Sequence, residues 1–378
     1  MYLRVLSVRN HKTVSFISGY STDFGNTQFM IDNNSYRNIK CGDLINIEYL
    51  DVFNQKNIPI KKIIKINEII TGKDFPSLKG MNNEKLDIKT KNLIEARNCG
   101  KPLRFLEFKK DVLYKLKEIL NNLNYFDATG LTNTIEINSN GSGIKEAEIK
   151  NREDKDPKFL RITLENQLKQ ISALTLKSVY AIEKVFRNMG EDKNHINEFL
   201  MLEMVSLLEN MSDVTTFVTN IDNSVKELAE KNKILIADNK LQIIDYSEID
   251  KSSINYEILR KSFLNTLVIN YPCESPFIKK DEKDGLRKEV RWYVNGHWIS
   301  HFYEDENNYN NIKEVLEKQK EKSIDKEINM LNYYEWGLPQ SISLGLSIDR
   351  WLQILCNLEN INSIANPLSL DYVKRRKL

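Results

Sequence analysis

The sequence predicts an α+β protein in which strands form the core and helices lie beside them. Up to about Ile70, apolar and polar residues alternate in short runs, which are separated by turn sequences such as DFGN, DNNS and KCGD. This spacing is typical of a small β-barrel. Beyond residue 102, strand-like segments follow segments whose apolar residues recur at helical spacing. Together these observations indicate an N-terminal barrel and a larger domain that mixes strands with helices.

Length and composition favour a two-domain globular protein. The chain has 378 residues, of which 41% are hydrophobic and 29% charged, so it can bury a sizeable core. Its net charge of +2 does not by itself indicate a nucleic-acid-binding surface. The four cysteines form no C-x-x-C pair, which argues against zinc and disulfides. The start MYLRVLSVRN is unlike a signal peptide and no apolar run is long enough to span a membrane, so we expect a cytoplasmic protein.

Five strands are expected in the first domain, which we assign to residues 1–75. They correspond to YLRVLSV, TVSFISGY, TQFMID, DLINIEYLDVF and KKIIKINEII. Residues 76–101 are polar and are expected to form a hinge. Residues 102–378 then form the second domain, which opens with the long amphipathic helix LRFLEFKKDVLYKLKEILNNLNY.

The second domain combines predicted strands and helices. VYAIEKVF and EFLMLEMVSLL are expected to be strands, and KEVRWYVNGHWISHFY is expected to be a hairpin that turns at Asn295 and Gly296. LENQLKQISALTL and the charged segment IKEVLEKQKEKSIDKEINML are predicted helices. Near the C-terminus, SISLGLSIDRWLQILCNL predicts a strand that runs into an apolar helix.

Two arginines lie where strands are predicted to end. Arg187 follows VYAIEKVF, and a polar loop with His195 leads from it to Phe199; Arg350 lies at the later strand-to-helix junction. A lone arginine is more often part of a surface ion pair. Two guanidinium groups aimed at one polyphosphate, with an aromatic face for a base, would instead form an ATP site. Such a site needs no glycine-rich phosphate loop, and the sequence contains no such loop.

The same segments resemble a known family. VFRNMGEDKNHINEFLMLE resembles motif 2 of class II aminoacyl-tRNA synthetases, and GLPQSISLGLSIDRWLQIL resembles their motif 3. LRITLENQLKQ is similar to the lysyl-type segment before motif 2, and LKGMNNEKLDIKTKNLIEARN to the hinge of the lysyl, aspartyl and asparaginyl subclass. The resemblance implies an OB-fold anticodon-binding domain followed by an antiparallel-sheet catalytic domain.

The resemblance also implies roles for the residues of the nucleotide site. Arg187 would hold the amino-acid carboxylate and the α-phosphate of ATP, and Arg350 would hold the γ-phosphate. Phe199 would stack on adenine, and His195 would lie near the phosphates. These four residues are therefore the candidate ATP-binding residues, and the two arginines are the candidate catalytic residues.

A second group of residues is implied to bind the amino acid. Glu165 matches the lysyl-type residue that takes the α-amino group. Glu203 and Asp305 match positions that meet a side-chain ammonium, and Tyr303 belongs to the same subsite. Two carboxylates around one ammonium would select a lysine-like substrate, although ordinary solvated carboxylates are an equally good interpretation of Glu203 and Asp305.

The usual magnesium ligands of this subclass are missing. The resemblance places Arg291 and Trp298 at the two acidic positions, and neither side chain can bind a hard cation. ATP is the cofactor expected from the nucleotide residues above. Any Mg²⁺ that accompanies it would lack its usual protein ligands. His297 and His301 share one strand face but have no evident third ligand, so structural or substrate-contacting histidines are favoured over a metal site.

Further departures indicate a diverged paralogue. The lysyl-type pattern differs in motif 1, motif 2, the side-chain subsite and motif 3, at Leu131, Met189, Val205, Ile342, Ser343 and Ser347.

Two functions therefore stay open. The first is an enzyme that activates an amino acid as its adenylate and transfers it to tRNA, a protein or a small molecule. The second is an inactive synthetase-like module that binds tRNA or a protein partner. A homodimer is expected in either case, because the region around Leu131 resembles motif 1, which builds the two-fold interface.

Overall fold

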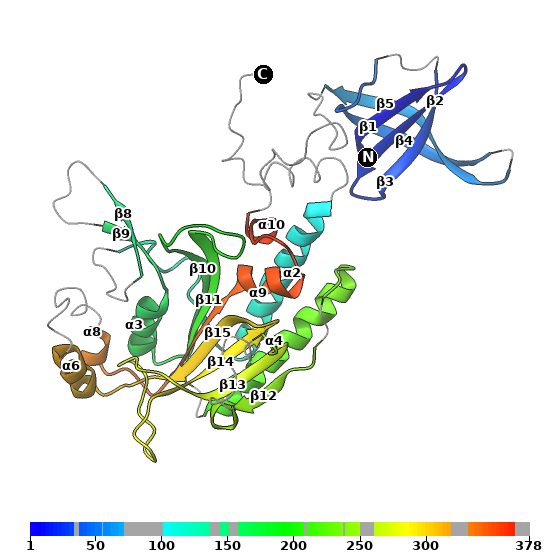
Figure 1. The fold of residues 1–378 in the computed structure, drawn as a ribbon. Coiled ribbons are helices and arrows are strands. Elements are labelled where there is room, and N and C mark those ends of the chain that lie inside the picture. The colour runs from blue at the N-terminus through cyan, green and yellow to red at the C-terminus, as the bar shows by residue number, and fades with distance from the viewer. Residues whose placement is uncertain are drawn as a thin grey trace. The chain divides into compact units, whose positions relative to one another are not determined.

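The computed structural model describes residues 1–33, 38–54, 56–71, 101–136, 144–150, 158–207, 210–236, 239–249, 261–318 and 332–366. The chain forms two compact units (Figure 1). The barrel unit comprises Met1–Glu107 with Asn366–Leu378, and the sheet unit comprises Phe108–Ala365. Almost all of the predicted hinge, residues 76–101, lies outside the described residues. The proposed domain limits at residues 75 and 102 therefore stay a prediction.

The barrel unit contains a closed five-stranded barrel. Its strands follow one another around the barrel in the order β1-β2-β3-β5-β4, and only the β3–β5 pair is parallel. This OB-like barrel confirms the five predicted strands. Their bounds are β1 Tyr2–Asn10, β2 Val14–Ser21, β3 Gly25–Asp32, β4 Leu44–Phe53 and β5 Pro59–Ile70.

The alternating pattern fills the barrel with apolar side chains. Leu3 and Ile17 are completely buried, as are Phe29 and Ile45 on the neighbouring strands. Gly19 lets β1 and β2 approach closely, because a Cβ atom there would lie 2.6 Å from the Leu3 side chain. Burying each large apolar side chain contributes roughly 1.5–3 kcal/mol, so the core stabilises the closed arrangement.

The sheet unit is built on an eight-stranded sheet with the order β12-β13-β14-β15-β16-β11-β10-β6. Figure 1 labels β10 to β15 of this sheet. Neighbouring strands are antiparallel except for β12–β13 and β6–β10. The sheet confirms the predicted α+β class. The bounds are β6 Phe126–Asp127, β10 Val179–Phe186, β11 Glu198–Ser206, β12 Gln242–Asp245, β13 Asn265–Pro272, β14 Lys288–Val294, β15 His297–Glu304 and β16 Ile342–Ser347.

The predicted hairpin turns where expected. Asn295 and Gly296 connect β14 to β15, and both have positive φ angles, 46° and 77°. Asn and Gly tolerate this conformation best, and it matches the twist of the flanking strands. A separate three-stranded sheet contains β7 Ile135–Glu136, β8 Ala147–Ile149 and β9 Lys158–Leu160.

Helices pack on the eight-stranded sheet. α9 begins directly after β16 and packs on β11, β14, β15 and β16, with Trp351 against Trp292 at 5.3 Å between ring centroids. The Asp349 carboxylate accepts a bond of 2.7 Å from the Leu200 backbone N–H, which fixes the start of α9. α3 packs on β10 and β11. The bounds are α2 Lys101–Asn122, α3 Glu165–Thr175, α4 Met211–Lys231, η3 Tyr246–Glu248, α6 Tyr309–Lys318, α8 Asn332–Glu335, α9 Ile348–Leu355 and α10 Asn362–Ala365.

Two further predictions concern helices and surface charge. The expected charged helix begins at Tyr309 as α6, and its continuation beyond Lys318 lies outside the described residues. In the part of the chain that the structure describes, no helix is long and apolar enough to cross a membrane.

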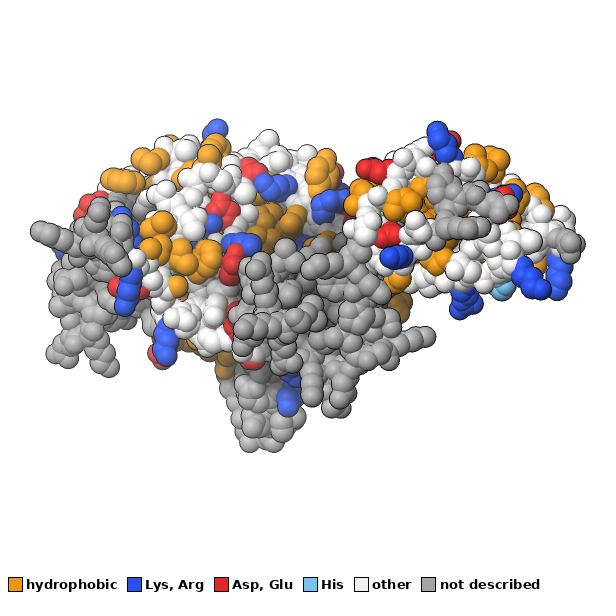
Figure 2. All heavy atoms as spheres, turned by 90° about the horizontal axis from the view of Figure 1, so that it is seen from above, with side chains coloured by type: hydrophobic (Ala, Val, Ile, Leu, Met, Phe, Trp, Pro, Cys, Tyr) orange, Lys and Arg blue, Asp and Glu red, His pale blue; other side chains and the backbone are white. Residues whose placement is uncertain are grey.

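Basic and acidic side chains are interspersed on the face shown in Figure 2, in keeping with the net charge of +2.

Candidate active site

Sheet register gathers the candidate residues on one face. Glu203 on β11 pairs with Gly345 on β16, Gly345 pairs with His301 on β15, and His301 pairs with Arg291 on β14. Paired positions project their side chains to the same face of a sheet. This row therefore crosses four strands, and Gly345 leaves space in its middle because it has no side chain.

The first of two cavities on this face has a volume of about 310 Å³. We call it the arginine cavity. Its walls include all four residues predicted to bind ATP, namely Arg187, His195, Phe199 and Arg350. Trp298, one of the two positions where a metal ligand was expected, lines it as well. The structure thus brings together residues from the end of β10, the following loop, β11, β15 and α9.

The two arginines of this cavity form no ion pair within 4 Å with an acidic side chain among the described residues. The Arg187 Nε donates to the Ile162 carbonyl at 3.2 Å, and the Arg350 Nη2 donates to the Asn194 carbonyl at 3.4 Å. Burial lowers the pKa of both guanidinium groups and outweighs the opposing charges of Glu203 on Arg187 and of Asp192 on Arg350, and the charge of Arg187 lowers the pKa of Arg350 further. Two partly buried cations that repel each other form a favourable site for a polyanion.

The loop that carries His195 is held in place. His195 Nδ1 lies 2.9 Å from both carboxylate oxygens of Asp192. Gln353 of α9 donates at 3.0 Å to the Lys193 carbonyl and to the Asn194 side chain. The imidazole remains more than half exposed, at 57%, so it can reach a ligand while the loop stays anchored.

The second cavity, of about 300 Å³, adjoins the first. We call it the carboxylate cavity. Glu165, Glu203 and Tyr303 line it, which are three of the four residues predicted to bind an amino acid. The two cavities have four lining residues in common, Arg187, Met201, His301 and Gly345. Arg187 therefore faces both.

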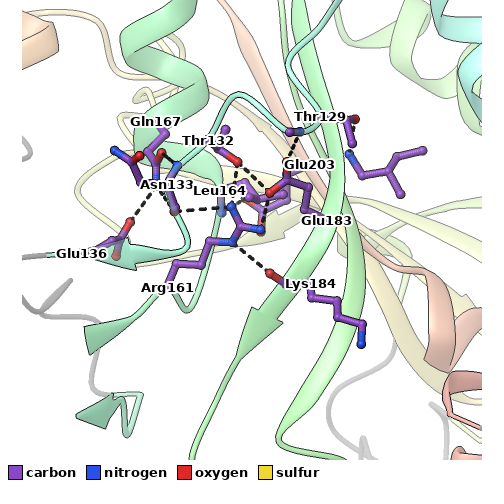
Figure 3. A network of polar contacts seen from close by, with 12 residues as sticks. Thr129, Thr132, Asn133, Glu136, Arg161, Leu164, Gln167, Glu183, Lys184 and Glu203 are labelled. Atoms are coloured by element: carbon purple, nitrogen blue, oxygen red, sulfur yellow. Dashed lines mark hydrogen bonds and ion pairs between the residues drawn. The ribbon is translucent and has the colours of Figure 1, made fainter. Parts of the chain in front are cut away.

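A buried network positions the segment that leads into α3 (Figure 3). The Arg161 guanidinium pairs with Glu183 of β10, and its Nε donates to the Lys184 carbonyl at 2.9 Å. Its Nη1 donates to the Thr132 hydroxyl at 2.7 Å. These contacts hold residues 161–165 against β10 and the loop after β6. The start of α3, which carries Glu165, therefore has a fixed position at the cavity.

Glu203 has hydrogen-bond donors but forms no ion pair within 4 Å among the described residues, and Arg187 acts on it only through its charge. Its carboxylate accepts from the Thr163 hydroxyl at 2.7 Å and from the Leu164 backbone N–H at 3.0 Å. Burial raises the pKa of Glu203, and the nearby negative charge of Glu165 adds to this. A ligand cation at this position would relieve both effects.

Lys169 is a site residue that the sequence reasoning missed. Its Nζ lies 2.6 Å from Glu165 Oε1 and 2.8 Å from Asp305 Oδ1, and its side chain is completely buried. Burial alone would lower its pKa, but the charges of Asp305 and Glu165 outweigh this and raise the pKa well above the usual value. The i,i+4 spacing of Glu165 and Lys169 on α3 was a signal for one of these two contacts.

Asp305, the fourth predicted amino-acid-binding residue, lies behind the cavity wall. It is completely buried and is not among the residues that line the cavity. Besides Lys169, it accepts hydrogen bonds from the Ser341 hydroxyl at 2.6 Å and from the Ser343 hydroxyl at 2.9 Å. Its oxygens are therefore occupied by the protein itself.

The residues near Arg291 do not fit a protein-bound Mg²⁺. Glu289, the acidic side chain beside them, is held by Arg291 Nε at 2.5 Å and by His301 Nδ1 at 3.0 Å. The Arg291 guanidinium also lies over the rings of Tyr271 and Trp298, at 3.6 and 4.5 Å from their centroids. Over the described stretches of the chain, no group of three or more His, Cys, Asp or Glu could hold a metal ion. Mg²⁺ prefers several free oxygen ligands, which this group does not offer.

Comparison with known proteins agrees with this architecture. Residues 86–366 match the family described as tRNA synthetases class II (D, K and N). The chain belongs to this family. This confirms the family resemblance that motifs 2 and 3 indicated.

Several curated relatives at low identity are lysine–tRNA ligases. The protein of Buchnera aphidicola subsp. Schizaphis graminum is 21% identical over 391 residues, which are 88% of this chain and 77% of the relative. That of Thermoanaerobacter pseudethanolicus is 23% identical over 442 residues, 96% and 84% of the two chains. That of Malacoplasma penetrans is 23% identical over 273 residues, and this chain spans only 55% of its length. The chain is thus a diverged lysyl-type member of the family.

Proposed function

We propose that this protein activates an amino acid with ATP, forming an aminoacyl-adenylate, and then transfers the aminoacyl group to an acceptor. The observation that carries the proposal is the position of Arg187 between two adjoining cavities. On one side lie a second arginine without an acidic partner and an aromatic ring, and on the other side lie carboxylates. A nucleotide and an amino acid that fill the two cavities would meet at this arginine.

The reaction needs positioning and charge stabilisation at the point where the ligands meet. The amino-acid carboxylate attacks the α-phosphorus, a new oxygen–phosphorus bond forms, and pyrophosphate leaves. Arg187 would hold the carboxylate and offset the charge that develops on the phosphate oxygens. Arg350 would hold the terminal phosphates, His195 would approach them from the loop, and the Phe199 ring would bind the adenine face.

The carboxylates provide the complementary contact to the amino acid. Glu165 and Glu203 face the second cavity, and an α-ammonium group would neutralise them. Tyr303 donates to Glu165 Oε1 at 2.8 Å and so fixes the direction of that carboxylate.

We propose tRNA as the acceptor and a homodimer as the working form. The OB-like barrel and the names of the relatives support tRNA, while a protein or a small molecule are the other acceptor classes. Leu131 is 64% exposed in the loop that resembles the dimer motif, as an apolar interface residue would be. Light scattering at micromolar concentration is expected to give twice the mass of the chain, and a monomer would contradict the dimer.

The test of activation is the amino-acid-dependent exchange of labelled pyrophosphate into ATP, measured over a panel of amino acids. Exchange above background with at least one amino acid supports the proposal. The alternative is an inactive synthetase-like module that binds tRNA or a protein, and the residues near Arg291 favour it because they do not fit Mg²⁺. Calorimetry that detects no ATP at millimolar concentration, with or without Mg²⁺ and amino acids, would support the module.

A further inference from the structure

We infer that the amino acid taken by the carboxylate cavity has an uncharged side chain, and that Lys169 is the residue that sets this specificity. The inference rests on the proposed function and narrows its substrate class. Some charged groups of the cavity are already neutralised by other groups of the protein, and others remain for a ligand. The difference between these two sets determines which amino acid the cavity can bind.

Lys169 places a permanent ammonium group against two of the carboxylates. It reaches Glu165 at 2.6 Å and Asp305 at 2.8 Å from a completely buried position. The Ser341 and Ser343 hydroxyls fill the rest of the Asp305 coordination. A side-chain ammonium from a ligand would have to compete with a cation of the protein that has no route to solvent.

A third carboxylate is also neutralised by the protein. Glu289 lines the cavity and is held by Arg291 and His301. Among the described carboxylates that line the cavity, only Glu203 forms no ion pair within 4 Å, although the positive charge of Arg187 lowers its pKa, and Glu165 has one oxygen, Oε2, for which the structure gives no donor. Glu165 is close enough to raise the pKa of Glu203. The two carboxylates therefore form one shared position for an ammonium group.

The charges left for a ligand match a zwitterion. One ammonium position lies at Glu203 and Glu165, and one guanidinium, Arg187, remains for a carboxylate. An α-amino acid uses both with its α-groups, and no further described carboxylate of the cavity is free for a charged side chain. The remaining wall includes Cys273, Phe277, Ile278 and Leu344, which would contact an apolar or weakly polar side chain.

The first experiment compares lysine with norleucine, which has the same carbon chain and no side-chain ammonium. Pyrophosphate exchange by the unmodified full-length protein is measured for both, with methionine and glutamine as further uncharged substrates. We expect kcat/KM to favour the best uncharged amino acid over lysine by about tenfold or more, because a charge without a partner is strongly rejected in a buried site. If lysine is preferred, this inference is overturned while the proposed function stands. If no amino acid supports exchange, the proposed function itself fails.

Variants then test the role of Lys169. Lys169→Met removes the ammonium at nearly constant length and is expected to raise the lysine-to-norleucine ratio of kcat/KM by about tenfold, since a ligand ammonium can then pair with Glu165, which lines the cavity, without a competing cation. An unchanged ratio would show that Lys169 does not set the specificity. Asp305→Asn keeps Lys169 and tests the same point if Lys169→Met fails to fold. In the Asp305→Asn variant, the lysine-to-norleucine ratio of kcat/KM should stay within about threefold of the ratio of the unmodified protein. A selective loss of activity with lysine would show that Asp305 binds the substrate side chain.

Discussion

The two cavities of the sheet unit treat charge in opposite ways, although they share Arg187 and His301. In the arginine cavity, Arg187 and Arg350 form no ion pair within 4 Å among the described residues, and they contact carbonyl oxygens, sulfur and an aromatic ring. In the carboxylate cavity, Lys169 and Arg291 neutralise most of the acidic groups.

This difference separates a site for a charged ligand from one that selects by shape. A buried or half-buried charge without a partner is unfavourable, so the free protein is stabilised if a ligand of opposite charge binds there. Internal ion pairs remove that driving force and leave the contacts of the remaining wall to choose the ligand. The arginine cavity thus favours a polyanion, and the carboxylate cavity a ligand with few charges.

The largest expected effect is on stability, from the internal pairs of the carboxylate cavity. Lys169→Met leaves Glu165 and Asp305 buried without their cation, so the free energy of unfolding should fall by about 3–5 kcal/mol. Lys65→Met, in the exposed pair with Glu48, is the matched control and should change it by less than about 1 kcal/mol. Urea denaturation measures both. Equal losses of unfolding free energy in the two variants would show that the buried ion pairs stabilise the protein no more than the exposed pair does.

The next largest effect is on catalysis, at the residue that faces both cavities. Arg187→Ala should reduce pyrophosphate exchange at least a hundredfold, because losing one preorganised contact to the transition state costs on the order of 3 kcal/mol. Lys184→Ala removes an exposed cation of the same strand, paired with Glu198, and should leave the rate nearly unchanged. Melting curves of both variants control for folding. An active Arg187→Ala protein would contradict the proposed mechanism.

Arg350→Ala should have a smaller and different effect. Its guanidinium lines only the arginine cavity, so it is expected to weaken ATP binding by about tenfold while the rate at saturating ATP changes less. Steady-state kinetics with varied ATP separate KM from kcat. A fall in kcat at constant KM would place Arg350 at the reacting phosphate instead, and would remove the distinction between the two arginines.

The smallest expected effect is that of added metal ion. Since Arg291 and His301 already occupy Glu289, ATP binding measured by calorimetry should change by less than about threefold between EDTA and millimolar Mg²⁺. Binding of ATP that requires Mg²⁺ would show that the protein supplies metal ligands after all. Arg291→Gln, which removes the ion pair at Glu289 Oε1, should then increase the effect of Mg²⁺.

The sequence by itself determined the architecture and the candidate nucleotide-binding residues. Period-two alternation predicts the barrel strands, because one face of each strand must be buried, and the Asn295–Gly296 pair predicts the hairpin. Arg187 and Arg350 were recognisable because each lies in a long motif that is continuous along the chain. Local spacing carries all of this information.

Only the tertiary structure decided how the charges pair. Lys169 and Asp305 are distant in the sequence and meet where α3, which packs on β10 and β11, reaches the residue that follows β15. Likewise, Glu289 meets His301 because β14 and β15 pair in one particular register. The physical reason is that a charge is neutralised by whatever lies within a few ångströms in space, and that neighbour is chosen by packing and not by position along the chain.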